Sequence, residues 1–478
     1  MTRNELPGGH TLPAHPLPSF RHAILCLSGV FLMISLGMFA YAASLHAIMF
    51  LALIWVGVQA ALLGYAFTDI RKMMNSGITQ ALPAIYIFLL IGMVIASFMQ
   101  SGTIASLLYY GLDLLSPAIF LAAGLILCSF MSVATGTSWG TVGTVGVVLM
   151  GIGETMDIPL PIVAGMIISG ATFGDKLSPL SDTTNLAAMS AGTNLYRHIY
   201  AMLYTTVPTF FIVLAILALL GLQYADNTLP TAHIEEIRVA LTGAYALNPW
   251  VTLLPLLLMF GLSMKRYSPE VSMSGSILLA MVIAILYQGR AGVDVVNALW
   301  LNTAGTTGIE RLDHLLGRGG IYSMAWTLLL SIMALALGGI LHHGGFLRVL
   351  LVQVIAHIKR VSTLIATTIA AGLVGNMAMG EAYISIILNC QLFRDSYQKQ
   401  ELDNAVLSRS VEEGSTLTTG LIPWTTAGVF YAATLGVPTL EYAPYAFLNL
   451  LNPVVSIIMV TLGIGLLRQK LNNPSTVD

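Results

Sequence analysis

The segment from Gly174 to Asn185 holds a dense group of side chains that can bind an ion. It reads Gly-Asp-Lys-Leu-Ser-Pro-Leu-Ser-Asp-Thr-Thr-Asn, with three charged residues and a run of hydroxyls between two apolar stretches. Pro179 interrupts a regular helix, because proline removes one backbone hydrogen bond and restricts the residue before it, which leaves nearby carbonyls free. Hard cations prefer such oxygen ligands. The segment therefore predicts a cation site, with candidate ligands Asp175, Ser178, Asp182, Thr183 and Asn185.

An extramembrane loop is the alternative interpretation, since Asp, Ser and Asn are also common turn residues. The segment follows the apolar run Ile167–Phe173, however, and ionisable groups at membrane depth are costly and by default mark ion pathways. Asp175 and Asp182 lie seven residues apart (182 − 175), either two turns along one helix or on both sides of the break. In either arrangement one carboxylate can hold an ion and exchange it for a proton. Lys176 either pairs with Asp175 or extends to the membrane surface.

Further candidate ligands lie at other interruptions of the apolar pattern. Small hydroxylated residues either supply uncharged oxygens at the tip of a re-entrant hairpin or mediate close helix packing. For Glu381 the alternative is a buried structural ion pair with Arg409. Two adjacent carboxylates, Glu412 and Glu413, point to different faces of a helix, so we expect only one of them to face the site. The candidates at these interruptions are Thr137, Ser138, Asn376, Glu381, Glu412, Thr416 and Thr419.

The composition requires a membrane. Of 478 residues 56% are hydrophobic and 9% are charged, whereas about a quarter are charged in soluble proteins. The stretch Ala23 to Phe67 has no charged residue and is long enough for two membrane spans. The formal net charge of −2 and the absence of a basic stripe exclude a nucleic-acid binder, and the absence of an HExxH motif gives no indication of an enzyme. We expect an all-α polytopic membrane protein of about twelve helical segments, some of them broken or re-entrant.

The apolar pattern is interrupted at corresponding places in the two halves of the chain. A shift of 240 residues places Gly140 on Gly380, Gly174 on Gly414 and Leu177 on Leu417. Paired breaks in two halves indicate a transporter built from inverted repeats with its site at their interface. Basic residues near the ends of the first hairpin predict cytoplasmic termini and an even number of crossings. The expected organisation is a disordered tail (1–20), an N-terminal hairpin (21–80), a first repeat (81–248), a connection (249–320), a second repeat with the last helix (321–467) and a C-terminal tail (468–478).

Three stretches resemble the NhaC family of sodium/proton antiporters: Gly136–Thr141, Gly174–Asn185, and Leu407 through Glu412 to Trp424. The resemblance implies a bacterial inner-membrane transporter that uses the proton gradient to expel sodium. It also implies that Glu412 joins Asp175 and Asp182 as a Na+ ligand. Thr425 stands where this family commonly has Asn after the Trp, which leaves ion selectivity less certain.

Na+ and H+ are the expected partners, within a lipid bilayer and without a cofactor, and a homodimer is left open. The alternative function is Na+- or H+-coupled exchange of a small organic acid or amino acid. Organic anions are commonly bound by an arginine, and only Arg409 lies near a break.

Overall fold

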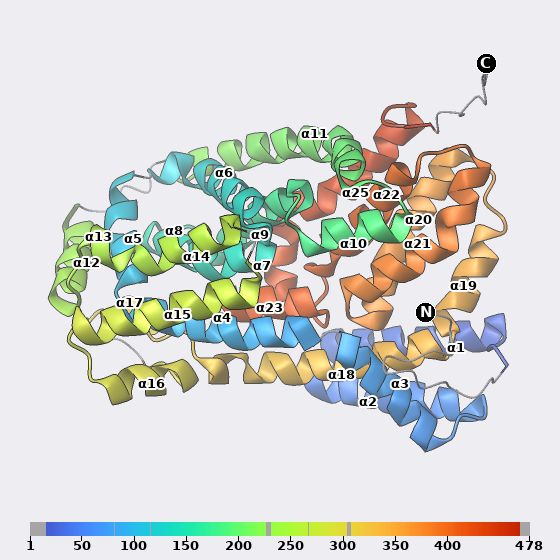
Figure 1. The fold of residues 1–478 in the computed structure, drawn as a ribbon, viewed down its shortest axis with the longest axis horizontal. Helices are drawn as coiled ribbons and strands as arrows, with labels where there is room; N and C mark the ends of the chain where they lie inside the picture. Colours follow the sequence, from blue (N-terminus) through green and yellow to red (C-terminus); the bar gives the residue numbers. More distant parts are fainter. Residues whose placement is uncertain are drawn as a thin grey trace, which may run out of the picture.

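The computed structural model describes residues 16–80, 82–114, 116–225, 231–265, 267–303 and 307–468, so nearly all of the two predicted tails lies outside the described residues. Within these ranges the chain is helical, apart from one isolated bridge between Leu402 and Arg468 (Figure 1). Eight helices are long and apolar enough to cross a membrane, or up to 11 spans if each bent pair of helices counts as one. The predicted all-α polytopic class is confirmed.

In chain order the elements are α1 (Phe20–Ser35), η1 (Leu36–Ala40), α2 (Leu45–Leu62), α3 (Phe67–Gln80), α4 (Leu82–Gln100), α5 (Thr103–Leu114), α6 (Pro117–Thr135), α7 (Ser138–Thr141), η2 (Val142–Gly146), α8 (Val147–Thr155), α9 (Leu160–Leu177), α10 (Asp182–Ala191), α11 (Leu195–Leu222), α12 (Thr231–Ala244), α13 (Pro249–Thr252), α14 (Leu254–Met264), α15 (Pro269–Leu286), α16 (Gly292–Trp300), α17 (Glu310–Leu316), η3 (Ile321–Met324), α18 (Ala325–His343), α19 (Phe346–Ile355), α20 (Val361–Met379), α21 (Ala382–Lys399), α22 (Asn404–Thr419), α23 (Thr426–Leu435), α24 (Thr439–Tyr442), η4 (Ala443–Tyr445) and α25 (Phe447–Thr461).

Each half of the protein contains a helical hairpin followed by a broken helix. In the first half α6 turns at Gly136, whose φ of 72° suits glycine, and α7, η2 and α8 run back along it. In the second half α20 turns at Gly380 (φ 69°) and α21 returns, with the Ser385 hydroxyl donating to the carbonyl oxygen of Gly372. The broken helices are α9 with α10 and α22 with α23.

The structure corrects the shift between the repeats from 240 to 244 residues. The glycines of the two hairpin turns lie 244 residues apart in the sequence (380 − 136). The prolines of the two breaks, Pro179 and Pro423, are separated by the same number. One hydrogen bond recurs at the same shift: Ser132 donates to the carbonyl oxygen of Ala171, and the Asn376 amide donates to that of Ser415. The shift of 240 was wrong by one helical turn, because glycines repeat every four residues at 170 and 174 and match equally well after a slip of one turn.

The helices of each half pack backbone to backbone through glycine. A Cβ atom on Gly170 would lie 2.6 Å from the carbonyl oxygen of Leu125 in α6. At the equivalent place in the second half, a Cβ atom on Gly414 would collide with the carbonyl oxygen of Ile369 in α20. Such close approach through small residues is a common way for helices to associate in a membrane.

We expect Gly414→Ala to lower the thermal stability of the purified protein. The added methyl group must displace backbone atoms, and overpacking of this kind costs about 1–3 kcal/mol. Melting of the detergent-solubilised protein measures the effect. Gly261→Ala is the matched control, because it is also helical and has open space around it, so the better helix propensity of alanine should leave its stability unchanged or slightly raised. Equal melting temperatures for the two variants would contradict the close-packing interpretation.

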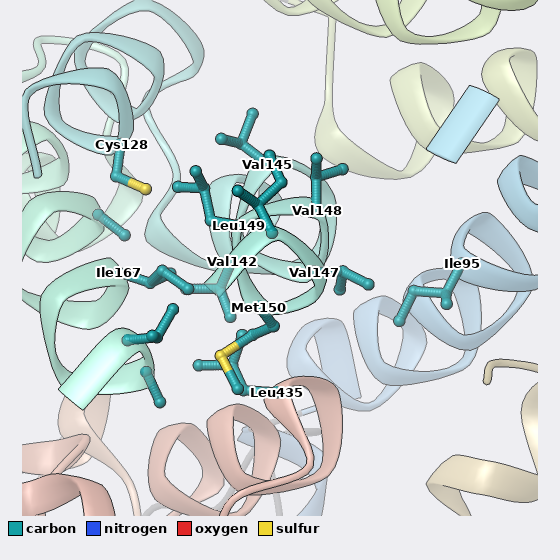
Figure 2. Packing of buried hydrophobic residues seen from close by; sticks show 14 of the residues in the cluster. Ile95, Cys128, Val142, Val145, Val147, Val148, Leu149, Met150, Ile167 and Leu435 are labelled. Atoms are coloured by element: carbon teal, nitrogen blue, oxygen red, sulfur yellow. The ribbon is translucent and has the colours of Figure 1, made fainter. Parts of the chain in front are cut away.

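The two halves pack against each other through the second helix of each broken pair, α10 and α23. In Figure 1, α6 and α9 lie left of the centre and α20, α21 and α22 lie to the right. α10 crosses to pack against α21 and α22, whereas α23 crosses in the other direction to pack against α7, η2 and α8. Figure 2 shows apolar packing in this region, where Val142 lies near Ile167 and Met150 lies near Leu435. This opposed arrangement is what the predicted inverted repeats require.

Candidate functional site

Both hairpin turns and both helix breaks line one cavity of about 100 Å³. Segments 174–185 and 414–425 therefore meet at this cavity, as a site at the interface of the two repeats requires. Eight of the predicted ligands line this cavity, which we call the central pocket: Thr137, Ser138, Asp175, Asp182, Thr183, Glu381, Thr416 and Thr419. The other four predicted ligands, Ser178, Asn185, Asn376 and Glu412, do not line it.

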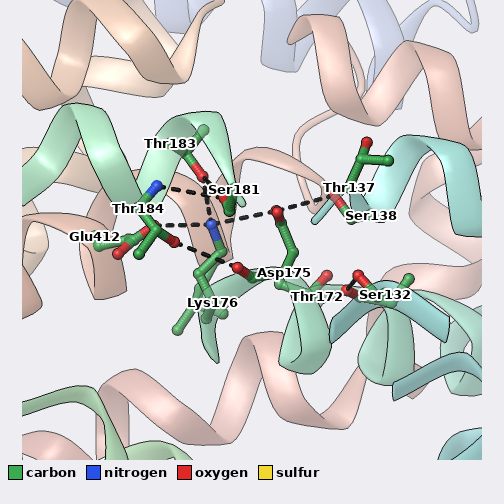
Figure 3. Close-up of polar contacts among 12 residues, drawn as sticks. Ser132, Thr137, Ser138, Thr172, Asp175, Lys176, Ser181, Thr183, Thr184 and Glu412 are labelled. Carbon is green, nitrogen blue, oxygen red and sulfur yellow. Dashed lines mark hydrogen bonds and ion pairs between the residues drawn. The ribbon is translucent and has the colours of Figure 1, made fainter. Parts of the chain in front are cut away.

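Asp175 lies between the central pocket and a buried cation. The Ser138 hydroxyl donates to Oδ2 of Asp175 at 3.2 Å, and the Tyr431 hydroxyl donates in turn to Ser138 (3.2 Å). Nζ of Lys176 lies 3.3 Å from the same Oδ2 atom (Figure 3). Lys176 therefore pairs with Asp175, which was one of the two alternatives, and its side chain is fully buried rather than extended to the membrane surface.

Glu412 lies behind the central pocket, on the far side of Lys176. Its Oε1 atom is 2.9 Å from Nζ of Lys176 and accepts a hydrogen bond from Thr184 at 3.2 Å (Figure 3). Its Oε2 atom is 2.6 Å from Nε2 of His198, a residue that sequence analysis missed. Lys176 thus joins a pocket carboxylate in the first repeat to a buried carboxylate in the second.

Three other predicted ligands hold the breaks in shape. Ser178 donates to the carbonyl oxygen of Val133 in the first hairpin (2.8 Å). The amide of Asn185 donates to the carbonyl oxygens of Pro179 (3.1 Å) and Ser181 (2.8 Å). Asn376 donates to the α22 backbone, as described above. Each of the three donates to a backbone oxygen, and Asn376 also donates to the Thr418 hydroxyl, so in this structure they position the breaks.

Glu381 is a pocket residue, and its predicted alternative partner is wrong. It caps α21 by accepting from the backbone N–H of Tyr383, and its Oε2 atom accepts from the Thr426 hydroxyl at 2.6 Å. Arg409 instead lies 3.8 Å from Glu413 and donates to the carbonyl oxygen of Gly465. Glu413 also accepts from Thr205 and Ser456, so adjacent Glu412 and Glu413 have different surroundings, and neither of them lines the central pocket.

At two equivalent positions, one repeat has a carboxylate where the other has a hydroxyl. At the shift of 244, Thr137 in the first hairpin turn corresponds to Glu381, and Asp182 at the start of α10 corresponds to Thr426 at the start of α23. Thr137 and Glu381 both cap the next helix, with φ and ψ of −146° and 122° in one and −146° and 128° in the other. At these two pairs of positions, each repeat therefore brings one acid and one hydroxyl to the central pocket.

Negative charge dominates the central pocket. Its described lining includes four carboxylates, Asp175, Asp182, Glu270 and Glu381, and no Lys, Arg or His. Glu270 was missed because an acidic residue in the first turn of a helix is ordinary in any protein. Among the described residues no three His, Cys, Asp or Glu side chains are close enough to form a compact metal site, so these acids do not form a tight chelate.

The central pocket also contains hydroxyl groups that make no hydrogen bond to the described protein atoms. The hydroxyls of Thr416 and Thr419 are buried and make no hydrogen bond to the described protein atoms. A buried hydroxyl without a partner is costly, and a bound cation or water would satisfy it. Carboxylates and hydroxyls together form a donor set suited to a weakly held cation.

Opposed hairpins, broken helices and a polar pocket at their meeting point, within a bundle of membrane-spanning helices, define a secondary transporter. The chain is thus a multi-pass membrane protein. It belongs to the Na+/H+ antiporter family, which matches residues 170–464.

Three similar proteins are named for the transport of different substrates. The Na+/H+ antiporter NhaC of Alkalihalophilus pseudofirmus is 37% identical over 447 residues, 92% of this chain and 95% of the relative. The malate-2H+/Na+-lactate antiporter of Bacillus subtilis is 37% identical over 396 residues, 83% of this chain and 84% of the relative. The arginine/ornithine antiporter ArcD of Halobacterium salinarum is 35% identical over 445 residues, 92% of each chain.

Proposed function

We propose that this protein exchanges Na+ for H+ across the bacterial plasma membrane through the central pocket. The observation that carries the proposal is the lining itself, which has four carboxylates and no basic side chain among its described residues. Membership of the Na+/H+ antiporter family and the similarity to an NhaC antiporter support it.

The pocket carboxylates would bind either Na+ or a proton. A carboxylate is held in its charged form by a nearby cation and is neutralised by a proton when no cation offsets its burial. Asp175 already shares one oxygen with Lys176, so an arriving Na+ would compete with the ammonium group for that oxygen. Lys176 would keep its second partner, Glu412, at 2.9 Å. Exchange itself requires that a pocket carboxylate which holds a proton releases it when Na+ binds, so that the site carries either ion but not both.

The alternative of an organic acid finds little support in the central pocket. A carboxylate substrate is commonly bound by arginine or lysine, and neither is present in the described lining. Arg409 is fully buried elsewhere and lies beside Glu413. The same negative lining favours a cationic amino acid as the second candidate, in line with the similarity to an arginine/ornithine antiporter.

Proteoliposomes with an imposed pH gradient and an internal pH-sensitive dye test the proposal. Addition of Na+ alone should dissipate the gradient, because proton and sodium fluxes are then coupled without another substrate. Choline chloride and protein-free vesicles are the controls. Malate, lactate, arginine and ornithine are added in separate runs. Dissipation that requires one of these compounds, with Na+ alone ineffective, would overturn the proposal and identify the cargo.

A further inference from the structure

A second and larger cavity adjoins the central pocket. It has a volume of about 320 Å³ and lies between the first hairpin turn, the end of α14 and the start of α15. The two cavities share five lining residues: Gly136, Thr137, Asp182, Pro269 and Glu270. Their two acids, Asp182 and Glu270, therefore lie at the junction between the cavities. We call the larger cavity the outer cavity.

The outer cavity is also negatively charged. Its described lining contains these two carboxylates and no Lys, Arg or His. The Asp182 carboxylate lies close enough to those of Asp175 and Glu270 to interact electrostatically with both. Clefts lined by one sign of charge concentrate ions of the opposite sign. A cation entering this cavity therefore meets Glu270 and Asp182 together before it reaches Asp175.

One polar group in the outer cavity lacks a protein partner. Ser272 is 1% exposed and lines the cavity, and its hydroxyl makes no hydrogen bond to described protein atoms. A buried hydroxyl of this kind needs a ligand or a water molecule. The cavity is much larger than the roughly 30 Å³ that one water occupies in the liquid, so an ion there can keep part of its hydration shell.

We propose that the outer cavity is a second cation site, where a partly hydrated Na+ is held by Glu270, Asp182 and Ser272 before it enters the central pocket. This inference rests on the proposed function and adds the route and a second binding position. Asp182 is exposed and faces both cavities, so it would serve both positions. Glu270 also lies at the junction of the two cavities, so its substitution tests capture of the ion.

Kinetics in proteoliposomes provide the first test. Glu270→Gln should raise the sodium KM roughly three- to tenfold, because the lost charge no longer concentrates the cation where the two cavities meet. Ser272→Ala should raise KM about twofold. Glu441→Gln is the matched control, since Glu441 is exposed and lines neither cavity, and its KM should equal that of the wild type. An unchanged KM in Glu270→Gln would overturn the inference while sodium-dependent proton flux in the wild type upheld the proposed function.

A second measurement does not depend on transport. Ser263→Cys places a thiol in the outer cavity, and the native cysteines at 26, 128 and 390 are buried. In purified protein, a trimethylammonium methanethiosulfonate reagent should modify this thiol about tenfold faster than its sulfonate analogue, after correction for reaction with a free thiol. Na+ should slow the modification, and added Glu270→Gln should reduce the preference for the cationic reagent, with Asp182 accounting for the remainder. A preference that Glu270→Gln leaves unreduced, or modification insensitive to Na+, would overturn the second cation site whether or not Na+/H+ exchange is observed.

Discussion

Asp182→Asn is expected to abolish sodium-dependent proton movement. Asn keeps the shape of the side chain but removes a charge that faces the central pocket and the outer cavity. Two unit charges about 4 Å apart interact by roughly 4 kcal/mol at an effective dielectric constant of ~20, so losing most of this energy lowers the exchange rate by on the order of a hundredfold or more. The decay of an imposed pH gradient on Na+ addition measures the loss.

The fold should survive this substitution. Asp182 is exposed and begins α10, and the N-cap of that helix is supplied by the Ser181 side chain rather than by Asp182 itself. Size-exclusion elution and melting temperature should therefore match the wild type. Asp294→Asn, an exposed acid in the first turn of α16, is the matched control and should transport normally. Normal exchange in Asp182→Asn would mean that Asp182 is an ordinary loop residue.

The apparent sodium KM should rise as the pH falls. If one carboxylate site binds either a proton or Na+, acid protonates the site and each sodium ion must first displace a proton. KM then approaches a tenfold increase per pH unit below the pKa of the site, because each unit costs about 1.4 kcal/mol. The maximal rate should change much less. Initial rates over a series of sodium concentrations, repeated from alkaline to acid pH, measure the effect.

A sodium KM that is independent of pH across the active range would instead mean separate proton and sodium sites. Glu381 is then the next candidate for the proton, because its carboxylate lies in the pocket and accepts only neutral donors in the contacts described above. The buried pair of Glu412 and His198 would be the other place to look, since one proton must lie between two atoms only 2.6 Å apart.

The acids of the breaks could be predicted because carboxylates inside apolar sequence are rare and conspicuous. Asp175, Asp182 and Glu381 all reach the central pocket for that reason. Glu270 and His198 could not be predicted: each stands near the start of a helix, where polar residues are common, and only the packing of α15 and α11 brings them to the pocket or to Glu412. The sequence also placed Glu412 in the break but could not show that Lys176 lies between it and Asp175.

The internal repeat was recognisable from sequence, but its register was not. Glycine positions alone tolerate a slip of one helical turn, whereas the prolines at 179 and 423 do not. Hydrogen bonds from Ser132 and Asn376 to equivalent backbone oxygens establish the register, and these two side chains differ in chemical type. Similarity between halves of this protein is therefore carried by geometry more than by residue identity.

The glycine contacts between α6 and α9, and between α20 and α22, limit how the protein can change shape. With no side chain between the backbones at Gly170 or Gly414, neither pair has a compliant layer that could absorb sliding. Each pair must then move as a rigid body. Opening of the pocket to the opposite side of the membrane would then occur between these pairs and their neighbours, and α9 would carry Asp175 with it.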